Sequence, residues 1–252
     1  MTAPPLGALL LAGPGIKFVL AVDIVSYLLS AAIIASLRHR QLPRSATDNG
    51  FRALEEGLRG VVKSKILQGL LITNGVFLTA NAGATALLVP FTVERLDVSG
   101  SSVGYLISGL GVGFLLGAAL SPKALTWLGI RDLLITTQLA TAAGFAAMFN
   151  APSLAWAIAG AALIGFPGSI LLITAETTVQ RVAPTDLLSR IGALFFAMDS
   201  LSVVIGALAA PALVGLIGLA NTLNVIATLA VLAAPITLFA VPGHPAKLSR
   251  IR

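Results

Sequence analysis

Seven long apolar runs are the feature of this sequence that most restricts its fold. Each is long enough to cross a hydrocarbon layer of about 30 Å at about 1.5 Å of rise per helical residue. Only helices and closed barrels satisfy their own backbone polar groups in lipid, and these runs lack the polar–apolar alternation of barrel strands. We therefore predict an all-α polytopic membrane helix bundle. The runs lie at about 18–37, 66–90, 102–121, 133–149, 154–176, 191–216 and 220–241.

The composition argues against soluble and enzymatic classes. Of the 252 residues, 57% are hydrophobic and 10% are charged, and the mean hydropathy is +0.96, whereas soluble domains carry about 25% charged residues. The absence of cysteine excludes a disulfide framework and a thiolate site. The two histidines, His39 and His244, lie in polar segments, and no Ser/His/Asp combination suits catalysis. We expect no enzyme activity, no metal and no cofactor.

The lysines and arginines indicate how the chain is oriented in the membrane. If the first run crosses from outside to inside, 14 of the 16 basic residues lie on the cytoplasmic side, and only Lys17 and Arg95 lie outside. Cytoplasmic loops are enriched in Lys and Arg, so we expect a protein of the cell (inner) membrane with a cytoplasmic C-terminus. The net charge of +6 is then a topology signal, and no nucleic-acid partner is expected.

Residues 38–65 form the one long polar connection between runs. Within it, FRALEEGLRGVVKS places Phe51, Leu54, Leu58 and Val61 on one helical face with charges opposite. This pattern is typical of an amphipathic helix on the cytoplasmic membrane surface, and a protein-docking helix is the alternative. Six runs follow the connection, an arrangement found in the second half of transporters built from two parallel six-helix repeats.

Three segments resemble the major facilitator superfamily, and in particular the macrolide-efflux-like branch of its drug:proton antiporters. TVQRVAPTDLLSRIGALFFAMDSLSVVIGAL resembles the segment joining helices ten and eleven, with Gln180, Pro184, Asp186 and Arg190 in matching places. FVLAVDIVSYLLSAAIIASLR is similar to the sixth helix. EGLRGVVKSKIL resembles the lead-in to helix seven. The resemblance covers essentially the whole chain.

The same resemblance gives a reading of the opening segment and of the domains. APPLGALL at 3–10 resembles the latter part of helix five, so the chain is expected to start within that helix, without helices one to four. The predicted parts are a partial helix five and helix six, a basic cytoplasmic linker with an amphipathic helix, a C-terminal six-helix bundle, and a cytoplasmic tail. Their bounds are 1–37, 38–65, 66–241 and 242–252.

Polar residues inside the apolar runs are the candidates for a transport path, because ionisable groups in a membrane are costly. Asp199 lies about 12 Å along its run. Since desolvation disfavours the charged form of a carboxyl group, Asp199 is either a proton-binding site or a hydrogen-bonded packing residue. Asn74, Asn81 and Thr85 follow one stripe of an earlier run, which faces either a substrate path or a neighbouring helix.

Cytoplasmic charges form a second group of candidates. Glu176 is close in sequence to Arg181, which favours an interfacial ion pair, and Arg190 and Arg131 are further members of this group. Arg131 matches an arginine of the cytoplasmic charge network of the superfamily. Thr126 stands at the acidic position of that network, so a loop that sets topology is the simpler interpretation.

Gly109, Gly113 and Gly117 stand four residues apart in GYLISGLGVGFLLGAAL. A dinucleotide-binding loop is excluded, because Phe114 occupies the position of the third glycine and no strand precedes the segment. Small residues at this spacing lie on one helical face and allow close helix–helix approach in lipid. We predict a tight helix contact there.

The resemblance implies a proton-driven exporter of small amphiphilic compounds, in which two six-helix bundles rock about a midplane site. This chain would supply one bundle embedded in the lipid bilayer. A separately encoded N-terminal half or a second copy in a homodimer would supply the other. The alternative from another class is a non-transporting membrane interaction subunit or an inactive transporter relic.

Overall fold

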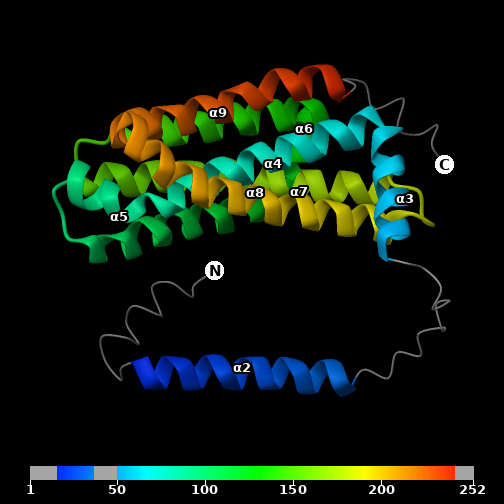
Figure 1. Ribbon diagram of the computed structural model, residues 1–252, viewed down its shortest axis with the longest axis horizontal. Coiled ribbons are helices and arrows are strands. Elements are labelled where there is room, and N and C mark those ends of the chain that lie inside the picture. The colour runs from blue at the N-terminus through cyan, green and yellow to red at the C-terminus, as the bar shows by residue number, and fades with distance from the viewer. Residues whose placement is uncertain (1–15, 37–49, 242–252) are drawn as a thin grey trace.

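The computed structural model describes residues 16–36 and 50–241, and every regular element among them is a helix (Figure 1). The predicted all-α class is therefore confirmed. The predicted end of helix five at 3–10 and the predicted tail at 242–252 lie outside the described residues. The elements are α2 (Ile16–Ser36), α3 (Gly50–Val62), α4 (Lys65–Ala86), α5 (Leu88–Pro90), the π-helical turn η1 (Phe91–Arg95), the 3-10 turn η2 (Gly100–Ser102), α6 (Val103–Phe149), α7 (Leu154–Val182), α8 (Leu188–Ile217) and α9 (Leu219–Ala240).

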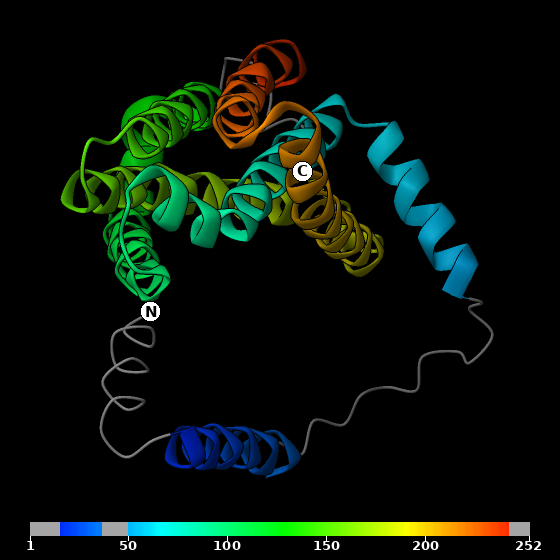
Figure 2. The same ribbon diagram turned by 60° about the vertical axis from the view of Figure 1, so that its left-hand side comes forward.

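Five of the described helices are long and apolar enough to cross a membrane, which confirms a polytopic membrane bundle. They are α4, α6 together with η2, α7, α8 and α9. The first predicted run falls on α2, which lies apart from the bundle in both views (Figures 1 and 2). The bundle exposes many large apolar side chains, as a lipid-facing surface requires.

Helix α6 contains two of the predicted runs. Its 47 residues would extend about 70 Å as one straight helix, more than twice the hydrocarbon thickness of a bilayer. Gly129 interrupts it with φ 72° and ψ 168°, a backbone conformation that L side chains rarely adopt and glycine allows. The predicted runs 102–121 and 133–149 correspond to the segments on either side of this break.

Both halves of α6 pack on α7, which lies between them in Figure 2. The first half runs parallel to α7, because its contacts advance in the same direction on both helices. They pair Gly109 with Ile158, Gly113 with Ala162 and Gly117 with Phe166. The second half runs antiparallel to α7, since Gly144 lies against Ile164 while Gly160 lies against Met148. The break at Gly129 therefore reverses the chain.

The three glycines of the predicted helix contact all lie at the first of these interfaces. A Cβ atom at Gly109 would stand 2.8 Å from the Ile158 carbonyl oxygen, closer than real Cβ atoms approach other heavy atoms. At Gly113 and Gly117 the nearest atom would likewise be a backbone carbonyl oxygen of α7. Small residues therefore allow the two helix backbones to touch, which is a main source of helix association in lipid.

Helix α3 packs against the first turn of α8 through its glycine side. Gly57 lies against the backbone of Arg190, Gly60 lies against Ile191, and Val61 is buried. Leu58, which was assigned to the same apolar face, is 49% exposed, and the side chains of Phe51 and Leu54 lie outside what the structure describes. The observed partner of this amphipathic helix is thus a transmembrane helix of its own chain.

Candidate functional site

The intramembrane carboxyl group of Asp199 is paired with an amide on a neighbouring helix. Asn74 of α4 donates a hydrogen bond from Nδ2 to Oδ1 of Asp199 on α8, with a distance of 2.6 Å. The Asn74 side chain is buried, whereas Asp199 is partly exposed. The Oδ1 atom of Asn74 has no hydrogen-bond partner among the described residues. The pair therefore offers a carboxyl group and one unused amide acceptor.

Close packing of α4 on α8 brings this pair together. Gly206 of α8 lies directly on the backbone of Thr79, and Gly75 of α4 lies on the Ser202 side chain. The two helices run parallel, because residues about 125–127 positions apart meet along their whole contact. Sequence reasoning missed this interface. The sequence feature that could have predicted it is the row of small residues on α8, spaced four apart, at Ser202, Gly206 and Ala210.

Asn74 and Asp199 open onto a cleft of about 640 Å³ between α4, α7 and α8. Glu176 and Gln180 of α7 line the same cleft, as do the rings of Phe195 and Phe196. Glu176 and Asp199 thus place two carboxyl groups on the wall of one cleft. The cleft thus combines two carboxyl groups and amide groups with an aromatic wall, which suits a compound that has both a polar or cationic end and an apolar body.

The predicted polar stripe on α4 divides between two sites. Asn81 and Thr85 line a separate pocket of about 140 Å³, whose other lining residues are all apolar and come from α4, α5, α6 and α7. Thr85 donates its hydroxyl hydrogen bond to the Asn81 carbonyl of its own helix, at 2.7 Å. Asn81 lies about 10 Å further along the helix than Asn74, and the stripe also drifts around the helix because seven residues at about 100° each fall about 20° short of two turns. Of these three residues, Asn74 is the one that bonds to Asp199, while Asn81 and Thr85 line the other pocket.

The predicted pair between Glu176 and Arg181 is not formed in the described part of the chain. Five helical positions separate these residues, so their side chains leave α7 about 140° apart. Arg190 instead pairs with Glu56 of α3. Arg131 has a buried Nε atom without a hydrogen-bond partner among the described residues, and Arg181 is exposed.

Metal-binding side chains do not gather anywhere in the described ranges 16–36 and 50–241, where no three His, Cys, Asp or Glu residues come together. The polar groups of the cleft are carboxyl and amide groups. The carboxyl groups can exchange a proton and, when ionised, attract a cation, and both kinds of group can form hydrogen bonds.

Comparison with known proteins gives one family and a group of distant relatives. Residues 1–250 match the family model described as "Transmembrane secretion effector". The chain is 23% identical over 205 residues to the enterobactin exporter EntS of Escherichia coli O1:K1 / APEC, and 25% identical over 207 residues to EntS of Escherichia coli O127:H6 (strain E2348/69 / EPEC). Each alignment covers 81% of this chain and 49% of the relative. The chain thus spans about half the length of these relatives.

Proposed function

Because the chain belongs to the transmembrane secretion effector family of the major facilitator superfamily, we propose that it forms one bundle of a membrane exporter. The exporter moves small amphiphilic compounds out of the cell in exchange for protons. The observation that carries this proposal is the Asn74–Asp199 pair at the wall of the cleft. It places an exchangeable proton beside the space that a substrate would enter.

Proton exchange at Asp199 couples to substrate through charge. A carboxyl group that faces a membrane cleft is less costly when neutral, and Glu176 places a second carboxyl group on the wall of the same cleft. A cationic substrate that enters the cleft favours the ionised carboxylate and so releases the proton. Asn74 donates to Asp199 and holds the carboxyl group in one orientation during this exchange.

The two pockets on α4 suit the two ends of an amphiphile. The cleft around Asp199 supplies carboxyl and amide groups, whereas the pocket lined by Asn81 and Thr85 is almost entirely apolar. Asn81 stands seven residues from Asn74, which is about 10 Å along the helix. We assign the cleft to the polar end of a substrate and the 140 Å³ pocket to an apolar group of about one ring.

Alternating access in this superfamily requires two bundles that rock against each other. The EntS relatives are about twice as long as the segment that this chain matches. We propose that the opposing bundle comes from residues encoded upstream in the same frame, from a separate neighbouring reading frame, or from a second copy. The DNA upstream of codon one distinguishes the first two sources. We further place the protein in the cell (inner) membrane with its C-terminus in the cytoplasm, since this orientation puts 14 of 16 basic residues inside.

The test is ethidium accumulation in everted membrane vesicles that contain the complete complex, driven by a pH gradient. Asp199→Asn should abolish accumulation and leave the amount of assembled protein unchanged. Asp186→Asn is the matched control, because Asp186 is exposed and lies outside the cleft. Equal transport by Asp199→Asn and the unmodified protein at every pH would remove Asp199 from the mechanism. No transport by the unmodified complex would favour the non-transporting subunit or relic.

A further inference from the structure

A second buried polar group lies on another side of α4, away from Asp199. Gln138 of α6 donates from Nε2 to the Thr237 hydroxyl of α9 at 2.9 Å. The Thr237 hydroxyl in turn shares a hydrogen bond of 2.8 Å with the hydroxyl of Thr73 on α4. All three side chains are buried. We call Thr73, Gln138, Thr237 and the neighbouring Thr141 the polar cluster.

Two atoms of the polar cluster have no partner among the described residues. They are Oε1 of Gln138 and Oγ1 of Thr141, which belong to side chains that are 3% and 1% exposed. Leaving a buried polar atom unpaired is costly, because its hydration is lost and nothing replaces it. Buried polar atoms in folded proteins therefore generally bond either to protein or to an ordered water.

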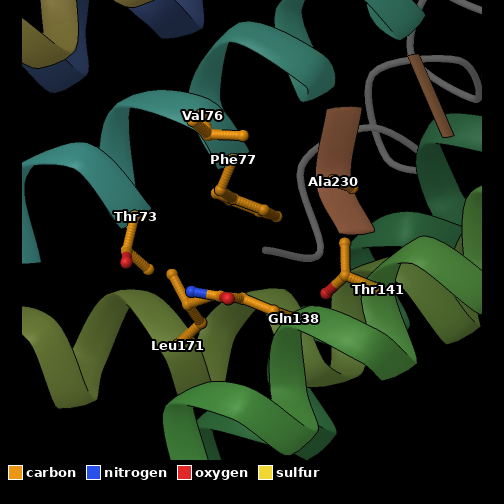
Figure 3. Close-up of a pocket in the computed structure, with 7 residues that line it drawn as sticks. All are labelled: Thr73, Val76, Phe77, Gln138, Thr141, Leu171 and Ala230. Carbon is orange, nitrogen blue, oxygen red and sulfur yellow. The ribbon is translucent and has the colours of Figure 1, made fainter. Parts of the chain in front are cut away.

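Both atoms belong to residues that line one small cavity. Figure 3 shows Gln138 lying between Thr73 and Thr141, with Phe77 and Leu171 among the apolar residues around them. The cavity offers about 10 Å³ to a water molecule, which is close to the minimum that one ordered water requires. The space thus has the size of a single water, and the two unpaired atoms belong to residues of its mostly apolar wall.

We propose that this cavity binds one ordered water molecule. The water donates a hydrogen bond to Oε1 of Gln138 and accepts one from the Thr141 hydroxyl, and the Thr73 hydroxyl is a third polar group within the lining. A cation is the wrong ligand, because no carboxylate lines the cavity and the amide group of Gln138 already donates into the cluster. The water completes a polar link between α4, α6 and α9.

Thr141→Val distinguishes a hydrated cavity from a dry one by the direction in which the unfolding midpoint changes. Valine has nearly the same shape as threonine and lacks the hydroxyl. If the cavity holds water, the substitution removes one of its partners. The thermal unfolding midpoint of the full chain in lipid nanodiscs should then fall by about 2–4 °C. If the cavity is dry, the same substitution removes an unpaired polar atom, and the midpoint should stay unchanged or rise.

Thr174→Val is the matched control. Oγ1 of Thr174 is also buried without a partner among the described residues, but Thr174 is not one of the residues that line this cavity. Its replacement should leave the midpoint unchanged or raise it. A structure of the full chain that resolves waters supplies the direct observation, a density peak within hydrogen-bonding distance of Gln138 Oε1. An empty cavity, or a midpoint that does not fall with Thr141→Val, overturns the proposal.

Discussion

Gly206→Ala should separate α4 from α8 and disturb the carboxyl–amide pair. A Cβ atom at Gly206 would stand 3.0 Å from the carbonyl carbon of Thr79 and 3.1 Å from Cβ of Ala82, and nearer still to the Thr79 carbonyl oxygen. To restore ordinary contacts of about 3.4 Å, the two helices must move apart by at least a few tenths of an ångström at these two atoms. The displacement at the Thr79 oxygen must be larger. A shift of α8 at Gly206 should also displace Asp199, because Asp199 stands two turns earlier on the same side of α8.

The size of the effect follows from two opposing terms. Overpacking costs about 1–3 kcal/mol, whereas glycine to alanine within a helix gains about 0.5–1 kcal/mol. Gly215→Ala on the same helix is the matched control, because a Cβ atom there meets nothing within 4 Å. The helix-propensity gain is common to both variants, so the difference between them isolates the clash of about 1–3 kcal/mol.

The assay is reversible unfolding of the full chain in detergent micelles by increasing denaturant, followed by helical circular dichroism. Gly206→Ala should unfold at a lower denaturant concentration than the unmodified protein, and Gly215→Ala at the same or a higher one. In vesicles that contain the complete complex, only Gly206→Ala should also reduce pH-driven transport. Equal stability of the two variants would refute the close helix contact and with it the explanation of how Asn74 reaches Asp199.

Two further predictions concern the other helix contacts. Gly113→Ala should destabilise the bundle by about 1–3 kcal/mol, because its Cβ atom would meet a backbone carbonyl of α7, whereas Gly104→Ala meets nothing within 4 Å and should not; equal unfolding midpoints would contradict this packing. Glu56→Gln should loosen α3 from α8, since it removes a charged partner of Arg190. A partly exposed pair is worth at most about 1 kcal/mol, so the expected readout is faster amide hydrogen exchange in α3 at low salt. Glu55→Gln, which affects a pair within α3 alone, serves as its control, and equal exchange in both variants would argue against docking by this pair.

The sequence was sufficient to predict the helices, because apolar length and the absence of strand alternation are local properties. It also placed the reversal near 122–132 and put three glycines on one face of a helix. The structure adds the partners: the α6 glycines meet carbonyl groups of α7, and the break falls at Gly129. Local periodicity indicates which residues share a face, but it does not indicate which helix that face meets.

In the candidate site, too, the residues could be predicted from the sequence but their partners could not. Asn74 and Asp199 were each identified as polar residues in an apolar run, yet their pairing depends on the closeness of α4 and α8 across 125 residues of sequence. Arg190 was assigned to a cytoplasmic charge group, and its partner Glu56 was not anticipated. Both contacts are set by helix packing at glycines, and packing distance leaves only a weak trace in the sequence of either helix.

Helix α4 carries the two polar sites on different sides, so its polar side chains link it to more than one neighbouring helix. Thr73 and Asn74 are consecutive, so their side chains leave the helix about 100° apart. Thr73 joins α4 to α9 and, through Thr237, to Gln138 of α6. Asn74 makes a single hydrogen bond to α8, and its second amide atom is unpaired in the described residues. Helix α4 is thus joined to α8 by the Asn74–Asp199 hydrogen bond and by close packing at Gly75 and Gly206, and to α9 and α6 by a chain of buried polar side chains.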